Sequence, residues 1–479
     1  MRQLLFFLLL YGHISVSTAV DLPDIGSSAD ILITRAQQRQ YGDMLYKSLH
    51  KYNLITEDIA ADTYIQSLGN RLASFAKAAD QPFHFFLIND KSINAFATFG
   101  GYIGVHIGLV LSSRSEGELA AVLAHEISHI TQQHLSRSLE KRKRNTIPLM
   151  IASAVALAAG AASGDGDVIE AAAAVASYGS YMLELKFTRD HEKEADRLGM
   201  QVLSDAGFNP YDMPAFFDVL YKKSRYYTKY PEFLSSHPIS LNRLSEATNL
   251  ANKLPKFNSL KEGTPLYHLI RARLLVASTD KLSPLIQQLD TMLIDKRYRS
   301  EKAVHYALAL AQLKLHRPEQ AKPHIDWLDK YDEKRVLYHD LHAQYQIEKG
   351  NDQQAATLYK TALLLYPKDN FLGLQYAKHL ISLQQGQAAF QLLSSLNNTY
   401  YPIYYLYLSQ AYQLLGKKIQ AHINLAEYHA LRGELKAAIA QLTLIRRQKN
   451  VDYYLLTKVN ARLKELNNAY NEIKALDNS

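Results

Sequence analysis

The segment His125-Glu126-Ile127-Ser128-His129 places two imidazoles and a carboxylate at a spacing that suits metal chemistry. Because residues four apart share one face of an α-helix, His125 and His129 can bind the same ion while Glu126 lies beside it. A zinc ion held by two imidazoles polarises a water molecule, and a neighbouring carboxylate can take the proton. The alternative is a surface helix with two solvated histidines, in a chain that contains 18 of them. The pattern predicts metal-assisted hydrolysis if the elements around it agree.

The residues before this motif predict the helix that carries it. Ser115 and Glu118 have the spacing of a capping box. Leu119, Val122 and Leu123 then form an apolar stripe. We therefore expect a helix that begins near Ser115, buries this stripe and presents the two histidines together.

A second polar segment, at positions 188–199, supplies the best candidates for the remaining ligand. Zinc needs a third protein ligand, and a catalytic site also needs an open position for water. Glu192 and Asp196 are four apart and share a helix face, whereas Glu194 points elsewhere. We expect Glu192 to bind the metal and Asp196 to accept the N–H of a ligating histidine. An ordinary charged helix surface is the alternative.

Three short apolar segments before the motif helix predict strands: 83–89, 93–99 and 102–107. Gly100-Gly101 marks a tight turn between the second and the third. The order predicts a small antiparallel sheet beside the metal site. The second strand is the candidate edge that binds an extended substrate peptide through main-chain hydrogen bonds, and the four residues within it that we expect to do so are Asn94, Ala95, Phe96 and Ala97.

Length and composition limit the function classes. A chain of 479 residues predicts two or more domains. With no cysteine, the chain has neither disulfides nor thiolate ligands, so a metal must use histidine and carboxylate. The net charge of +8 is modest, and no basic stripe is interleaved with aromatic residues, so nucleic-acid binding has no support.

Two apolar regions raise the question of membranes. Arg2, the apolar run 4–11 and the small residues up to Ala19 predict a secretory signal peptide over 1–19. The Ala-rich stretch 147–176 predicts a buried helical hairpin; the alternatives are a lid over the metal site or a helix that touches the membrane. The basic run 141–144 fits either the solvated end of a helix or peripheral contact with an anionic membrane.

The C-terminal part repeats itself every 34 residues. This period, with small residues where two helices touch, is typical of tetratricopeptide repeats, which bind other proteins. We therefore expect a metallopeptidase domain over 20–254, a linker over 255–265 and a repeat domain over 266–479. The small residues that define the two columns of the repeat are Ala309, Ala343, Ala377 and Ala411, and Ala321, Ala355, Ala389 and Ala421.

Together these motifs resemble the clan of membrane-linked zinc peptidases that includes HtpX and the CAAX prenyl proteases. More closely, the chain resembles the secreted beta-barrel assembly-enhancing proteases, which carry a C-terminal tetratricopeptide domain. The resemblance covers essentially the whole chain after the signal. Thr98-Phe99 departs from it, because the family usually has a proline there. The segments that carry the resemblance, besides the metal motifs, are 22–26, 94–97, 100–103, 236–238 and Arg243.

The resemblance implies a site and a setting. It implies His125, His129 and Glu192 as ligands of one zinc ion per chain, with Glu126 as general base and acid. It also implies the periplasm of a Gram-negative bacterium and quality control of outer-membrane proteins. Unfolded or misassembled barrel proteins would then be degraded or assisted, with the repeats docking the assembly machinery.

Two further residues have alternative roles. His237 is either structural or a fourth zinc ligand, which would displace the water and keep the enzyme inactive until a partner moves its loop. Arg243 either stabilises the developing oxyanion or is structural. The competing function is a non-catalytic chaperone or adaptor with a vestigial metal site, although an intact Glu126 favours an enzyme. The predicted fold class is mainly α, with a small antiparallel sheet in a zincin-like α+β domain, followed by an all-α tetratricopeptide solenoid.

Overall fold

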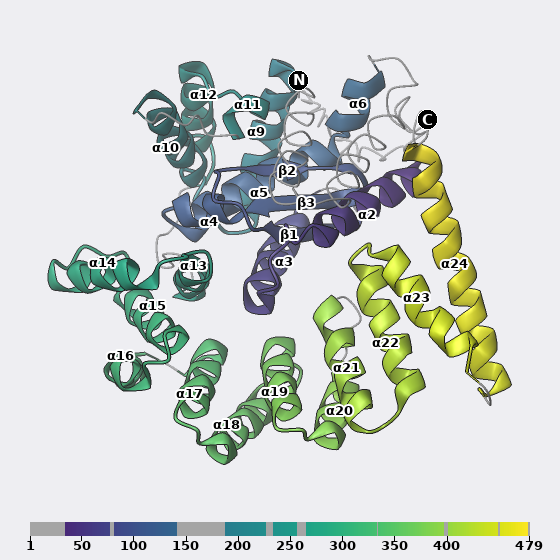
Figure 1. Cartoon of the computed structure of the whole chain (residues 1–479). Helices are drawn as coiled ribbons and strands as arrows, with labels where there is room; N and C mark the ends of the chain where they lie inside the picture. Colours follow the sequence, from purple (N-terminus) through teal and green to yellow (C-terminus); the bar gives the residue numbers. More distant parts are fainter. Residues whose placement is uncertain are drawn as a thin grey trace, which may run out of the picture.

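The computed structural model describes residues 34–76, 81–140, 187–226, 233–255, 265–332, 334–396, 401–448 and 451–477. The predicted signal peptide, the basic run, the Ala-rich stretch and most of the predicted linker lie outside these residues. Among the described helices, none has both the length and the apolarity needed to cross a bilayer. The fold class is as predicted, a mainly α domain with a small sheet followed by an all-α solenoid, except for the direction of one strand (Figure 1).

The sheet has the strand order β1-β3-β2 and is mixed rather than antiparallel. Strand β2 (Ala95–Ala97) pairs antiparallel with β3 (Tyr102–His106), whereas β1 (His84–Ile88) pairs parallel with β3 on its other side. The prediction of an antiparallel sheet is wrong for β1, because the hairpin partner of β3 is β2 and β1 adds to the far edge. The almost wholly apolar sequence of β1 fits this position, since both of its faces are buried.

The turn between β2 and β3 depends on glycine. It forms a single 3-10 turn, η1 (Phe99–Gly101), in which Gly101 has φ +88°. A Cβ atom on Gly101 would collide with the carbonyl oxygen of Pro82, so a side chain is excluded there. The tight return makes β2 the short edge strand of the sheet.

The motif helix, α5 (Glu116–Thr131), begins where the sequence predicts. The Ser115 hydroxyl accepts a hydrogen bond from the Glu118 N–H at 3.1 Å. Only this half of the capping box forms, because the Glu118 carboxylate accepts from the main chain and guanidinium of Arg114 instead. Helix α9 (Arg189–Asp205) packs closely on α5, since a Cβ on its Gly199 would lie 3.0 Å from the backbone of Ala124.

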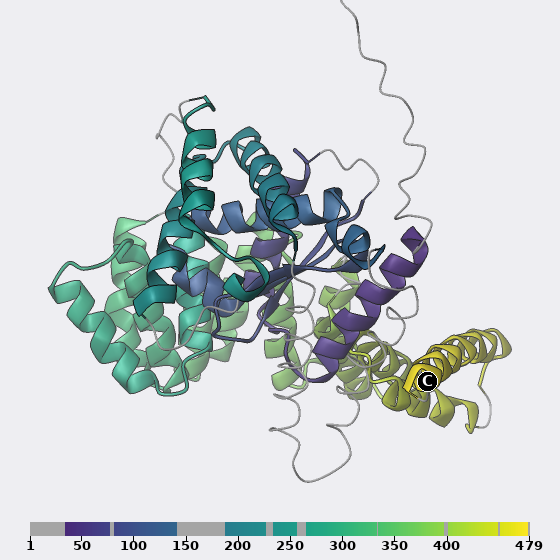
Figure 2. The ribbon, with the colours of Figure 1, turned by 90° about the horizontal axis from the view of Figure 1, so that it is seen from above.

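The other helices of the N-terminal domain surround this pair and the sheet (Figure 2). Helix α3 packs on β1 and α5, while α10 and α12 pack on α5 and α9. The bounds of these helices are α2 Arg35–Lys51, α3 Ile59–Ala73, α4 Ile107–Ser112, α6 His134–Glu140, α10 Asp212–Tyr226, α11 Phe233–Ser236 and α12 Leu241–Ala251.

The C-terminal domain is an arc of helical hairpins (Figure 1). All eight alanines of the predicted 34-residue repeat are buried, one column on α15, α17, α19 and α21 and the other on α16, α18, α20 and α22. The predicted contact of two helices at small residues is therefore confirmed. Its helices are α13 Pro265–Ala277, α14 Leu282–Ile294, α15 Glu301–Lys314, α16 Pro318–Tyr331, α17 Val336–Glu348, α18 Asp352–Leu365, α19 Asn370–Ser382, α20 Gly386–Ser395, α21 Pro402–Leu414, α22 Lys418–Leu431, α23 Leu435–Arg446 and α24 Tyr453–Asp477.

The arc contacts the N-terminal domain near both of its ends (Figure 1). In α13, Arg273 donates to both carboxylate oxygens of Asp58, at 2.9 and 2.7 Å. After α22, Arg432 pairs with Glu57 at 2.6 Å. Two arginines thus hold neighbouring residues of the loop between α2 and α3.

Candidate metal centre

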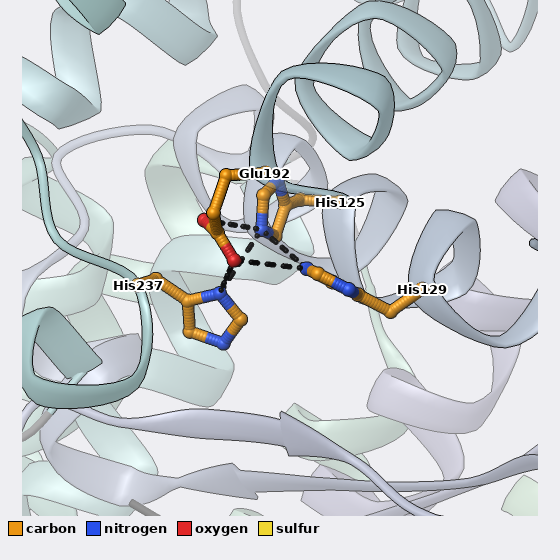
Figure 3. Close-up of side chains that lie close together, drawn as sticks. All are labelled: His125, His129, Glu192 and His237. Atoms are coloured by element: carbon orange, nitrogen blue, oxygen red, sulfur yellow. Dashed lines mark hydrogen bonds and ion pairs between the residues drawn. The ribbon is translucent and has the colours of Figure 1, made fainter. Parts of the chain in front are cut away.

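Four buried side chains converge in the N-terminal domain: His125 and His129 from α5, Glu192 from α9 and His237 from the loop after α11 (Figure 3). One ligand atom from each lies within 4.8 Å of the others. All four residues are at most 2% exposed. The structure thus brings together the two motif histidines and the predicted carboxylate ligand Glu192. It also adds His237, which the sequence left as either structural or a fourth ligand.

The orientation of the two motif histidines fits a shared cation. His125 Nδ1 lies 3.0 Å from a carboxylate oxygen of Asp196, so this nitrogen carries the proton and Nε2 presents a lone pair. The Nε2 atoms of His125 and His129 are only 3.0 Å apart and both point toward the carboxylate of Glu192 (Figure 3). Lone pairs facing one another at this distance, beside a carboxylate, form a donor set that could hold a metal ion.

Arg243 holds the carboxylates of this site in place. Its Nε and Nη2 each donate to Asp196 at 2.8 Å, while Nη1 lies 2.7 Å from Glu192 and donates to the carbonyl oxygen of Pro238. Burial raises the pKa of the Asp196 carboxyl, but Arg243 and His125 outweigh burial and hold that pKa below its usual range. With its donors committed to these partners, Arg243 fits the structural role better than that of an oxyanion donor.

Glu126 lies beside the converging ligands and is completely buried. Burial raises the pKa of its carboxyl, and the neighbouring histidines, first His237 and then His125, oppose this only in part. Its Oε1 lies 3.5 Å from His237 Nε2. A buried carboxyl with a raised pKa is suited to take up a proton and return it.

His237 is fixed by main-chain and ring contacts. The N–H of Phe233 donates to the carbonyl of Ile93, just before β2, and the N–H of His237 donates to Phe233. The rings of Phe233 and His237 stack at 4.6 Å. The Nδ1 atom of His237 lies 2.9 Å from Oε1 of Glu192 and 3.3 Å from Nε2 of His125. The His237 ring therefore occupies the side of the cluster that the other three residues leave open.

The candidate substrate strand borders the same site. Asn94 accepts from the N–H of His106, and the N–H of Thr98 donates to Tyr102, so these peptide groups face β3. In an antiparallel pair, successive residues point their main-chain N–H and C=O groups alternately toward and away from the partner strand. The main-chain groups of Ala95 and Ala97 therefore face away from β3, on the side of α5. Phe96, between them, packs its ring against the β3 residue Gly104.

Sequence reasoning missed His134, whose ring contacts the back of His129, and it assigned no role to Glu194, which pairs with His134. The available signal was the third histidine of His125-x-x-x-His129-x-x-x-x-His134. Burial lowers the pKa of His134 to about 4, so its ring is neutral. His134 points at the outer nitrogen of His129, away from the metal side.

Comparison with known proteins agrees with this geometry. Residues 60–251 match the model of Peptidase family M48. The beta-barrel assembly-enhancing protease of Escherichia coli (strain K12) is 31% identical over 451 residues, which cover 94% of this chain and 92% of the relative. The protein of the same name from Yersinia pestis is 33% identical over 471 residues, covering 92% of each chain.

A more distant relative, the mitochondrial metalloendopeptidase OMA1 of Schizosaccharomyces pombe, is 26% identical over 229 residues, which cover 48% of this chain and 61% of the relative. The family match includes all four converging side chains and Glu126, whereas the bacterial relatives also cover most of the helical arc. The chain therefore belongs to the beta-barrel assembly-enhancing protease family, and its N-terminal domain is a metallopeptidase of family M48.

Proposed function

We propose that this protein is a zinc-dependent endopeptidase of the periplasm that degrades or assists misassembled outer-membrane proteins. The observation that carries the proposal is the set of four buried ligand atoms within 4.8 Å, with Glu126 and the edge strand β2 beside them. The printed name of the bacterial relatives, which refers to beta-barrel assembly, supports the substrate class.

The donor set favours zinc over magnesium and calcium. Three imidazoles and one carboxylate suit zinc, whereas magnesium and calcium prefer oxygen ligands alone. When bound, the ion supplies Lewis acidity for water and for the substrate carbonyl. His125, His129 and Glu192 would hold it.

The protein's own groups account for the remaining chemistry. The outward main-chain groups of Ala95 and Ala97 would bind the substrate as an added strand and so orient its scissile bond beside Glu126. Glu126 would take a proton from water and return it to the leaving amine. Arg243 and Asp196 would keep the ligand carboxylate and imidazole aligned throughout.

His237 is proposed as a fourth ligand that keeps the resting enzyme inactive. Its Nδ1 lies 2.9 Å from Glu192 and its ring stacks on Phe233, so the ring would occupy the position at which water enters. A substrate that adds beside β2 would disturb the link from Phe233 to Ile93 and so release the loop.

Replacing His237 by Ala is expected to raise basal proteolysis about three- to tenfold, because the ring no longer blocks the open position. The measurement is the cleavage rate of an unfolded protein, with metal content determined in parallel. The matched control is His316→Ala, since His316 is exposed on the solenoid and far from this cluster in the fold. A His237→Ala variant that retains metal and cleaves at the wild-type rate would leave His237 with a structural role only.

The helical arc is proposed to dock substrate or assembly-machinery partners, which allows a chaperone activity alongside proteolysis. The substrate class is tested with one outer-membrane barrel protein in two states, unfolded in urea-diluted buffer and folded in detergent micelles. An added strand requires an extended segment, so cleavage of the unfolded state is expected to be at least about tenfold faster. Equal rates for the two states would remove the quality-control role while leaving the peptidase.

A further inference from the structure

The back of the metal centre contains a second group of polar side chains that are not ligands. His134, at the start of α6, has its Nδ1 2.9 Å from Nδ1 of His129. Its Nε2 lies 3.1 Å from a carboxylate oxygen of Glu194 on α9. Arg137 lies 3.3 Å from the same oxygen. His134 is fully buried, whereas the side chain of Glu194 is 31% exposed.

We propose that His134 and Glu194 are positioning residues, which fix the tautomer and the ring orientation of the metal ligand His129. This proposal rests on the metal centre proposed above and extends it to residues outside the ligand set.

For neutral rings, only one arrangement of protons fits these distances. His129 faces the other ligands with Nε2, so Nε2 must be the lone pair and Nδ1 must carry the proton. That proton is donated to Nδ1 of His134, which must therefore accept. His134 then carries its own proton on Nε2 and donates it to Glu194, a carboxylate that can only accept.

Helix α9 thus orients both ligating imidazoles by different routes. Asp196 faces His125 directly, with a carboxylate oxygen 3.0 Å from Nδ1, whereas Glu194 acts on His129 through the ring of His134. The same helix supplies Glu192 to the metal side. Because a metal-bound histidine is a better ligand when its other nitrogen donates to a fixed acceptor, loss of either route should weaken metal binding.

Neighbouring aromatic contacts hold the rings of His129 and His134 in place. The ring of His191, also on α9, stacks on His134 at 4.4 Å and 12°. Phe187 stacks on His129 at 4.0 Å. The rings of His191 and Phe187 therefore limit rotation of the His134 and His129 imidazoles. The hydrogen bonds then select the tautomer.

The test measures zinc affinity by chelator competition and the visible spectrum of the cobalt-substituted protein, so it does not depend on proteolysis. His134→Phe keeps the ring volume but removes the acceptor, and its dissociation constant for zinc is expected to rise about 10- to 100-fold. His134→Asn places an amide oxygen near the Nδ1 position and is expected to restore most of this affinity. Glu194→Gln removes the charge and is expected to weaken zinc binding about three- to tenfold, with a shifted cobalt spectrum.

Lys193→Gln is the matched control, because Lys193 adjoins Glu194 on α9 but pairs with Glu246 on the exposed side. If His134→Phe does not fold, the partly exposed Glu194→Gln carries the test. Wild-type zinc affinity and an unchanged cobalt spectrum in Glu194→Gln and in any folded His134→Phe would overturn the proposal. The proposal would also be overturned if His134→Phe lost zinc affinity together with a lower Tm of its metal-free form, and His134→Asn did not restore that affinity. A wild-type protein that binds no zinc would overturn the metal centre itself, and this role with it.

Discussion

Glu126→Gln is expected to lower the rate of peptide hydrolysis about a thousandfold while the protein keeps its metal. The amide has the same shape as the carboxyl but cannot take up or return a proton. Glu126 is completely buried, and its Oε1 lies 3.5 Å from Nε2 of His237. Since burial raises the pKa of this carboxyl, proton uptake is favourable in the wild type and is lost in the variant.

The measurement is kcat/KM for an unfolded protein substrate, with metal content and Tm determined on the same samples. Glu246→Gln is the matched control. It is the same isosteric change, but Glu246 lies in an exposed ion pair with Lys193. A wild-type rate in Glu126→Gln would show that the cleavage does not arise at this site, and it would favour the competing function, a non-catalytic chaperone with a vestigial metal site.

Arg273→Ala is expected to lower the free energy of unfolding by about 3–5 kcal/mol, because it breaks a largely buried ionic group that joins the two domains, in which the side chains of Arg273 and Asp58 are 11% and 14% exposed. Arg273 donates to Asp58 in the N-terminal domain and lies 3.7 Å from Asp340 in α17. Asp340 is 1% exposed, and burial already raises the pKa of its carboxyl despite this arginine. Removing the guanidinium leaves two carboxylates without their cation.

The free energy is measured by denaturant unfolding at pH 7.5. Arg297→Ala is the control, since Arg297 forms an exposed pair with Asp295 and its loss should change stability by less than about 0.5 kcal/mol. Adding Asp340→Asn to Arg273→Ala should recover part of the loss. A change below about 1 kcal/mol in Arg273→Ala would show that the contact does not tie the solenoid to the N-terminal domain.

The parts of the site that lie on helices could be predicted from spacing. His125 and His129 share a face because they are four apart, and so do Glu192 and Asp196, and each occupies the expected place. The buried alanines of the solenoid were predictable for a similar reason, since a fixed period records where helices touch. In these cases the local period of the helix determines the geometry.

Other parts depend on how distant segments meet, which spacing does not record. The apolar, aromatic-rich sequence of β1 indicates a strand but not its neighbour, so the parallel pairing with β3 could not be foreseen. His237 reaches the ligands only because Phe233 binds the carbonyl of Ile93, far away in the sequence. His134 lies beyond the end of α5, and its contact with His129 follows from the direction in which α6 leaves the motif helix.

Anomalous scattering at the zinc edge, from crystals of the purified protein, tests the central claim most directly. The expected result is one strong peak per chain, within bonding distance of His125, His129 and Glu192, with His237 on the fourth side. A protein without stoichiometric metal, or a peak remote from the Glu192 carboxylate, would contradict the metal centre and the proteolytic function that depends on it.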